Sequence, residues 1–293
     1  MKSKFRFLAV ALAGFGVSGL ALASSTWTLT AGDTALSTTK PAFDSTTVTA
    51  TAWANTGAWT GTDNGATKND QNSGVITKQE NKADNNSNTN FGVRSYGGGI
   101  GITNYDACGG SYYQACKYDT AGKLIGDNGD GTQPEHAIDN QGRYEMVLLQ
   151  FSEKVNLTAL NIGWTDTSKD ADFTVLAYQG SGSSSVDGKT WSTLDAGWKL
   201  VSNYSNTTTG TKSLNSNGET TYYSSFWLIG AYNPLGGTAN SAYSGSDYLK
   251  LASVTGNTCT STTPGCGGGN VPEPSSLLLI GVGLLGLLRM RRT

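Results

Sequence analysis

The sequence predicts an all-β protein, a jelly-roll-like β-sandwich that forms one domain over residues 24–256. Three observations lead to this fold class. Short runs of alternating apolar and polar residues recur along the chain, Gly/Asn-rich turns separate them, and no stretch of the body has a 3.6-residue apolar period. Many short strands without helical periodicity are typical of two packed antiparallel sheets. The part of this domain up to about residue 132 is polar and loop-rich.

Side-chain alternation locates the strands. Residues 144–151 read YEMVLLQF, with apolar side chains on both faces, so we expect a strand in the middle of the sandwich. Leu160, Ile162 and Trp164 alternate with polar or small residues, which predicts a further strand buried on one side. The remaining strands are expected at residues 27–30, 46–53, 173–178, 198–204, 225–232 and 248–254.

The aromatic residues divide into two groups. The chain has seven tryptophans, and those in alternating runs, such as Trp164 and Trp227, are expected to fill the core, although exposed rings could stack on sugars. The pairs Tyr112-Tyr113 and Tyr222-Tyr223 lie in polar, turn-rich segments and are expected to face solvent.

Residues 1–23 have the three parts of a secretory signal peptide. Basic residues precede an uncharged apolar stretch, and Ala21 and Ala23 provide the small residues at positions −3 and −1 that signal peptidase requires. We expect cleavage between Ala23 and Ser24, which sends the body across the inner membrane. An uncleaved N-terminal membrane anchor is the alternative.

A second apolar segment lies near the C-terminus. Residues 277–288 carry no charge, and Arg289, Arg291 and Arg292 follow directly. This segment is short for a hydrocarbon core of about 30 Å, but arginines that snorkel to the interface lengthen its reach. An arginine-rich end favours a cytoplasmic tail. We therefore expect a short transmembrane helix that stops transfer of the exported body.

The residues before this helix indicate what it is for. The expected recognition signal is the tripeptide Pro272, Glu273 and Pro274, preceded by Val271. We expect it to be extended and stiff, because each proline disfavours helix for itself and for the residue before it. This order of Pro-Glu-Pro, short apolar helix and arginine cluster resembles the PEP-CTERM sorting signal. The resemblance implies that residues 271–293 are a sorting and anchor segment processed by an exosortase, in a Gram-negative bacterium that makes exopolysaccharide. A plain tail anchor is the alternative.

Cysteines and a linker lie between the body and this segment. Residues 257–270 are Gly/Thr-rich, which is typical of a flexible linker that lets an enzyme reach the sorting motif. An exported chain with four cysteines is expected to form two disulfides, and three pairings are possible. The spacing favours Cys108–Cys116 and Cys259–Cys266. A zinc site is the alternative, although neither spacing is that of a zinc knuckle.

The charge of the body argues against nucleic-acid binding, and its residue types argue against catalysis. The formal net charge is −2, and the sorting segments hold several of the basic residues, so the body itself is acidic and is not expected to bind nucleic acid. His136 is the only histidine, within a loop that includes Glu135, Asp139 and Asn140. No G-x-S-x-G elbow accompanies it. We expect no catalytic residues and no enzyme, with a surface glycan hydrolase using acids near His136 as the remote alternative.

A calcium site is the other chemical possibility. Asp127 and Asp130 lie in a Gly/Asp-rich stretch with hard oxygen ligands, but the second acid is one residue out of register for an EF-hand-type loop. An Asx/Gly turn explains the stretch more simply. The segment PEHAIDN is similar to a loop of discoidin-type carbohydrate-binding jelly rolls, which calcium often stabilises. We expect no cofactor, with a calcium-stabilised carbohydrate-binding module as the alternative.

A longer resemblance covers residues 133–256. The runs HAIDNQGRYEMVLLQF, LNIGW, FTVLAY and SSFWLIGAYN resemble the exosortase-dependent surface proteins. This resemblance implies surface location and a shared fold, and it brings no biochemical activity. The expected function is that of an exported cell-surface or extracellular-matrix protein, associated with exopolysaccharide and biofilm. The resemblance includes His136, Asp139, Asn140, Trp164, Trp198, Tyr204, Trp227 and Asp247.

Overall fold

The structure is a computed structural model, and the described part of the chain is almost entirely β. No α-helix occurs in this part, and its helical residues are one 3₁₀ turn, η3 (Trp191–Thr193). The all-β prediction is confirmed. The described residues are 24–31, 36–37, 45–56, 74–80, 92–104, 117–118, 124–126, 137–140, 143–166, 171–214, 221–235, 247–260 and 266.

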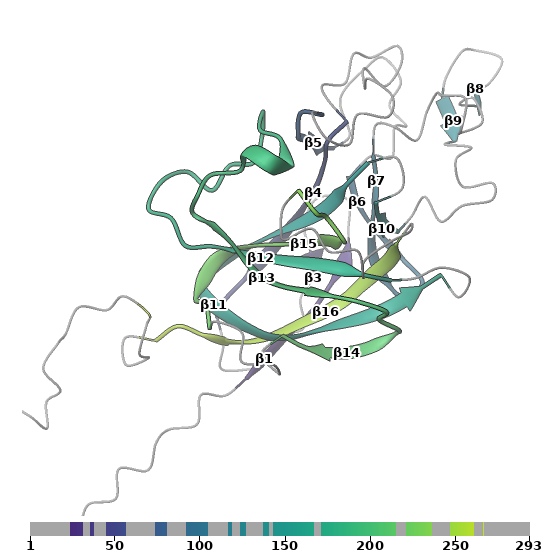
Figure 1. Ribbon diagram of the computed structural model, residues 1–293. Coiled ribbons are helices and arrows are strands. Elements are labelled where there is room, and N and C mark those ends of the chain that lie inside the picture. Colours follow the sequence, from purple (N-terminus) through teal and green to yellow (C-terminus); the bar gives the residue numbers. More distant parts are fainter. Residues whose placement is uncertain are drawn as a thin grey trace, which may run out of the picture.

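A 12-stranded antiparallel sheet forms the body, and two small ribbons accompany it (Figure 1). The ribbons are β2 (Thr30–Ala31) with β3 (Leu36–Ser37), and β8 (Lys117–Tyr118) with β9 (Leu124–Gly126). The strands of the main sheet are β1 (Ser25–Thr28), β4 (Val48–Ala54), β5 (Thr77–Gln79), β6 (Gly92–Tyr96), β7 (Gly99–Thr103), β10 (Ile138–Asp139), β11 (Glu145–Thr165), β12 (Phe173–Tyr178), β13 (Trp198–Tyr204), β14 (Gly210–Ser213), β15 (Ser224–Ala231) and β16 (Tyr248–Thr258).

Strand β11 joins the two layers of the sandwich. Its first part pairs with β4 and β15, and its second part pairs with β14 and β16. The register with β15 shifts between Gln150 and Val155, and Val155 pairs with both Ser224 and Thr258. A bulge of this kind bends a strand and increases its twist, so one hydrogen-bonded sheet folds over onto itself. Residues 160–164 are confirmed as β-strand, but they continue β11 rather than form a further strand.

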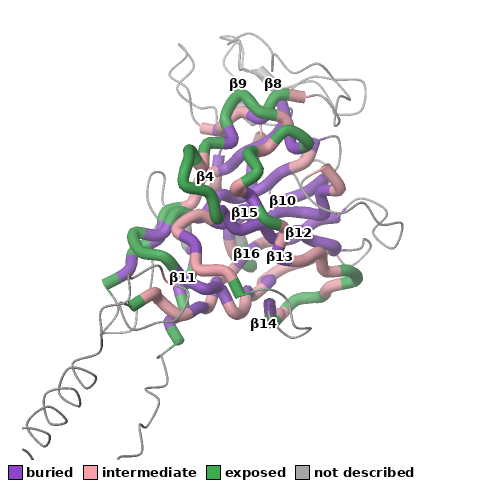
Figure 2. The backbone as a smooth tube through the Cα atoms, turned by 60° about the vertical axis from the view of Figure 1, so that its left-hand side comes forward, coloured by how far each residue is buried: buried purple, intermediate pink, exposed green. Residues whose placement is uncertain are grey.

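Two apolar clusters flank the first part of β11. Val147, Leu149 and Phe151 face the core between the layers, where they meet Trp27 of β1 and Trp227 of β15. Both of these indole rings are fully buried between the two layers. Figure 2 shows the buried residues in the middle of the molecule and exposed stretches along its outer loops.

The opposite face of β11 is buried by a loop. Met146 and Leu148 pack in a second cluster with Val186 and Trp191, which lie in the segment between β12 and β13. The Trp191 indole also donates to the Tyr144 carbonyl oxygen at 3.2 Å, which fixes the loop over this face. The prediction that residues 144–151 are buried on both faces is confirmed.

The strand predictions differ mostly at strand ends. Residues 173–178 and 198–204 are confirmed as β12 and β13, and β15 lies one residue earlier than expected at each end. Strand β16 continues to Thr258, so the segment expected as linker from residue 257 begins within the sheet. The residues that extend it are Thr255, Gly256, Asn257 and Thr258, which carry no apolar signal.

Candidate functional site

The structure tests only part of the expected sites. Asp139 and Asn140 are buried, each 8% exposed, and Ser24 is exposed directly before β1. The other residues of the expected sites and segments lie outside the described residues: Ala21, Ala23, Cys108, Cys116, Asp127, Asp130, Glu135, His136, Val271, Pro272, Glu273, Pro274, Arg289, Arg291 and Arg292.

Asn140 and Asp247 form the centre of a buried polar cluster. The Asn140 Nδ2 donates to Asp247 Oδ2 at 2.6 Å, and the backbone N–H of Asp247 donates back to Asn140 Oδ1 at 2.8 Å. Asn140 follows β10 and Asp247 precedes β16, so the pair joins the ends of two neighbouring strands. Asn140 Nδ2 also donates to the Tyr232 carbonyl oxygen at 3.2 Å, beyond the end of β15.

Asp172 extends the cluster to the start of β12. Its backbone N–H donates to Asp247 Oδ1 at 2.9 Å, and its own Oδ1 accepts from the Asn206 backbone N–H at 2.6 Å. Asp172 and Asp247 are both fully buried. Buried carboxylates need such donors, because burial without them is costly. These two acids therefore hold loops together at one end of the sandwich.

Glu145, the first residue of β11, accepts hydrogen bonds from two neighbouring segments. Its Oε1 accepts from Asn104 Nδ2 at 2.6 Å, and its Oε2 accepts from the Asp139 backbone N–H at 3.0 Å. Glu145 is 1% exposed. Both carboxylate oxygens thus bind groups of the protein. Within the described ranges, no group of three or more His, Cys, Asp or Glu residues is placed to hold a metal ion.

Trp164 lies at the surface rather than in the core. The β11–β16 register shifts between Ile162 and Trp164, so Ile162 points into the core while Trp164 is half-buried opposite Lys250. The Lys250 Nζ lies 4.7 Å from the Trp164 ring centroid, within cation–π range. The expectation that Trp164 fills the core is wrong, because a bulge reverses the side on which later residues point. The other described tryptophans are buried: Trp27, Trp53, Trp191, Trp198 and Trp227.

Polar residues in register form rows beside this pair. One row runs straight across β1, β16, β11 and β14, and its outer members are exposed. We call these rows, with Trp164 and Lys250, the outer face. The first row contains Thr28, Ser253, Asn161 and Thr211, and the second contains Thr26, Thr255, Ala159 and Ser213.

Hydrogen bonds tie members of these rows together. Asn161 Nδ2 donates to Thr211 Oγ1 at 3.2 Å, and the Thr26 and Thr255 hydroxyl oxygens lie 3.0 Å apart. Neighbouring strands are about 4.8 Å apart, so the first row presents polar groups at a nearly even spacing, while Ala159 interrupts the second row. Sequence reasoning missed this face. Its signal was the alternation of threonines with Trp27 in β1, but the cross-strand register needs the structure.

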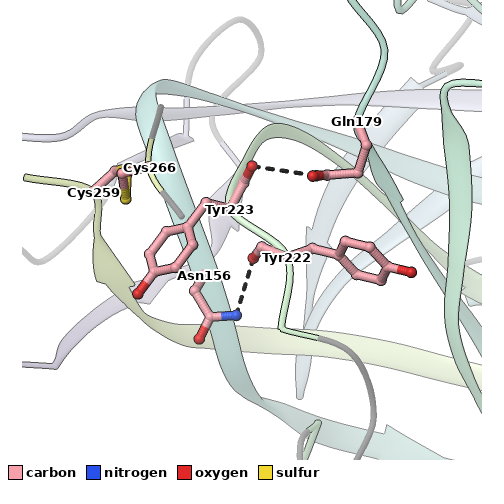
Figure 3. The surroundings of a disulfide bond; sticks show 6 residues. All are labelled: Asn156, Gln179, Tyr222, Tyr223, Cys259 and Cys266. Atoms are coloured by element: carbon pink, nitrogen blue, oxygen red, sulfur yellow. Dashed lines mark hydrogen bonds between the residues drawn. A yellow bond between two sulfur atoms is a disulfide. The ribbon is translucent and has the colours of Figure 1, made fainter. Parts of the chain in front are cut away.

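The Cys259–Cys266 disulfide is present, as predicted, with Cα atoms 5.7 Å apart. The Cys259 backbone N–H donates to the Lys154 carbonyl oxygen at 2.7 Å, which adds one rung to the β11–β16 pairing. Beside the disulfide, Asn156 Nδ2 donates to the Tyr222 carbonyl oxygen at 3.0 Å (Figure 3). Tyr222 and its neighbour Tyr223 are half-buried, and Tyr222 packs against the core, so the expectation that it faces solvent is wrong for Tyr222.

Comparison with known proteins identifies the C-terminal segment. Residues 270–292 match the family described as the PEP-CTERM protein-sorting motif. No curated protein and no solved structure matches the chain. The residues of the motif lie outside the described part, and within that part no helix is long and apolar enough to cross a membrane. The motif implies an exported protein with a membrane-anchored C-terminal sorting signal that an exosortase processes, followed by display at the cell surface.

Proposed function

We propose that this chain is a non-catalytic surface or extracellular-matrix protein whose outer face binds exopolysaccharide made by the exporting cell, a Gram-negative bacterium that forms biofilm. The observation that carries the proposal is the outer face itself. Trp164 lies there beside Lys250, next to rows of hydroxyl and amide side chains. The sorting motif supports the proposal because it delivers the body to the compartment in which such a polymer accumulates.

The chemistry of this face suits a sugar polymer. Hydroxyl and amide groups donate and accept hydrogen bonds with sugar hydroxyls, and the Trp164 ring offers an apolar surface to a sugar ring. The Lys250 ammonium attracts a carboxylate if the polymer is acidic. Each contact contributes only about 1 kcal/mol, but a repeating polymer engages several rows and several copies of the protein, and this multivalency raises the overall affinity.

The buried acids support a non-catalytic role. Glu145, Asp172 and Asp247 accept hydrogen bonds from backbone or amide groups at loops that they hold together. A glycosidase would instead need two carboxyl groups facing a bound sugar about 5 to 10 Å apart. We accordingly propose that polysaccharide binding requires neither catalytic turnover nor calcium. The proposed processing partners of the chain are a signal peptidase and an exosortase.

Binding of the secreted, mature protein to exopolysaccharide tests the proposal. Purified exopolysaccharide of the exporting strain is sedimented with wild-type protein, with Trp164→Ala/Lys250→Ala, and with the control Lys199→Ala, which removes an exposed lysine on β13. We expect the wild type and the control to co-sediment and the double variant to remain in the supernatant. The polymer should keep its length, and a chelator should leave binding unchanged.

Each other outcome points elsewhere. Equal binding by all three proteins would exclude the outer face. Binding that chelator abolishes would favour the calcium-stabilised carbohydrate-binding module, and shortening of the polymer by purified protein would favour a hydrolase. Absence of wild-type binding would refute the exopolysaccharide role while leaving the sorting motif unaffected.

A further inference from the structure

The first and last strands of the main sheet bring both ends of the body to one place. Strand β1 pairs with β16 in antiparallel register, with Ser25 opposite Gly256. The exposed Ser24, which follows the predicted cleavage site, therefore lies beside the end of β16 that leads to the sorting motif. Both membrane-directed segments thus leave the sandwich at the same end.

The disulfide is attached to the last rung of this strand pair. Cys259 donates its backbone N–H to the Lys154 carbonyl oxygen, so the cysteine belongs to the ordered sheet. The disulfide places Cys266 next to it, with a Cα–Cα separation of 5.7 Å. The chain between the two cysteines, which are seven positions apart in sequence, consequently adds almost no reach to the tether.

The effect on tether length follows from covalent geometry. At about 3.4 Å per residue, Pro272 reaches at most about 26 Å from Cys259 when the disulfide is closed, and about 44 Å when it is open. The effective concentration of a tethered group falls roughly as the −3/2 power of tether length, so opening the disulfide lowers contact between this end and the membrane about two- to threefold.

We propose that the disulfide end of the sandwich docks on the lipid bilayer surface while the precursor is anchored. The disulfide end consists of the exposed residues Ser24, Glu153, Lys154 and Thr260, together with Cys259. A bilayer is the occupant because the sorting motif, which is membrane-anchored, begins within this short reach. The proposal depends on the sorting motif and is independent of exopolysaccharide binding.

The Asn140–Asp247 cluster is held away from the membrane in this arrangement. It lies at the start of β16, and the 11 residues of that strand span about 33 Å. The Ser205 side chain is exposed at this far end, next to Asn206, whose backbone N–H donates to Asp172. Ser205 therefore provides a reference position for measuring which end faces the bilayer.

Lipid quenching of a site-specific dye tests the orientation. The anchored precursor is purified from membranes of a strain without exosortase and placed in phosphatidylcholine vesicles that carry a headgroup nitroxide quencher. A dye is attached through a click-reactive residue at position 153 or at position 205, which leaves the cysteines untouched. We expect quenching at residue 153 and none at residue 205.

Two variants isolate the role of the tether. Cys259→Ser/Cys266→Ser should lower quenching at residue 153 about two- to threefold, because the tether lengthens. Deletion of residues 260–266 in a Cys259→Ser background restores a short tether without a disulfide, so it should restore quenching. Recovery in this second variant separates tether length from any loss of stability.

Several results would overturn the proposal. These are equal quenching at both positions in wild type, unchanged quenching in the double serine variant, or no recovery in the deletion variant. A precursor that does not float with the vesicles would also overturn it, by removing its premise. That failure is distinct from failure of the proposed function, because exopolysaccharide binding is measured on the mature protein without a membrane.

Discussion

The Asn140 side chain makes two hydrogen bonds to Asp247, 107 residues away in sequence: its Nδ2 donates to the Asp247 carboxylate at 2.6 Å, and its Oδ1 accepts from the Asp247 backbone N–H at 2.8 Å. Each side chain also bonds to a further segment. The Asn140 amide donates to the Tyr232 carbonyl oxygen, and the Asp247 carboxylate accepts from the Asp172 backbone N–H. The pair therefore fastens the loop before β11 to the starts of β12 and β16. We infer that its role is to hold this end of the sandwich closed.

Removing the Asp247 carboxylate should be strongly destabilising. Asp247→Ala leaves the Asn140 amide and the Asp172 backbone N–H without their bonds to this carboxylate, and we expect the free energy of unfolding to fall by about 3 kcal/mol. Chemical denaturation of the purified protein measures this loss. The control Asp187→Ala alters an exposed turn residue and should change stability by less than about 0.5 kcal/mol. Equal effects of the two substitutions would contradict a structural role for the cluster.

The hairpin turn between β6 and β7 requires glycine at one position and not at its neighbour. Gly98 has φ +95°, and a Cβ there would lie 2.6 Å from Trp164 Cβ and 2.8 Å from the Gly163 carbonyl oxygen. Gly98→Ala should therefore cost about 2 kcal/mol or more and increase amide hydrogen exchange in β6 and β7. Gly97→Ala is the matched control, since no atom lies within 4 Å of a Cβ at that position. Similar exchange in both variants would show that the close approach is not important.

The two environments of tryptophan should give different mutational costs. Trp227 is fully buried in the core, so Trp227→Ala should lower the free energy of unfolding by about 3–5 kcal/mol. Trp164 is half-buried and adds a cation–π contact with Lys250, so Trp164→Ala should cost about 1 kcal/mol. Denaturant unfolding of the two variants checks the difference. A larger cost at Trp164 than at Trp227 would contradict its surface placement.

Tyr144 should make stability depend on pH in the alkaline range. Burial raises the pKa of its phenol above the usual 10.0, and the negative charge of ionised Tyr232 raises it further. The Tyr144 phenol therefore holds its proton more strongly in the folded protein than in the unfolded chain. The resulting contribution to the free energy of unfolding is fully present below pH 10. It is lost as the pH rises through the raised pKa. Tyr144→Phe should weaken the alkaline decline in melting temperature, with Tyr223→Phe as the control.

The C-terminal mass of the mature protein tests the processing step. We expect protein from wild-type cells to lack Arg289–Thr293, because the matched sorting motif implies removal of the tail by an exosortase. Replacement of Pro272, Glu273 and Pro274 by alanine should leave the tail in place and the chain in the membrane fraction. Intact-mass spectrometry gives both answers. A wild-type protein that retains its final arginines would point to a simple tail anchor.

Local patterns predicted the strands well where both faces or one whole face carried apolar residues. β12 and β13 were located as short apolar-rich runs bounded by turn residues, and the Cys259–Cys266 pairing followed from spacing. The hairpin β6–β7 was missed because glycines dominate it, and glycine carries no face preference. Strand β14, with sequence GTKS, was missed for the related reason that it has no apolar side chain.

The candidate sites were harder to predict, since their members are distant in sequence. Asn140 was expected in a site, but its partner Asp247 becomes apparent only when β10 and β16 pair. Trp164 was assigned to the core because a strict two-residue period continued through Ile162. The bulge between them breaks that period, and a bulge leaves no clear mark in composition.

The sequence by itself determined the all-β class, the sorting motif and therefore the destination of the protein, because these depend on local periodicity and on contiguous motifs. The tertiary structure decided which residues share the outer face, which acids are fastened to loops, and that both ends of the body emerge together. Those properties arise from the strand register and from the bends in β11. Both depend on contacts between segments that are far apart in the chain. No local stretch contains that information.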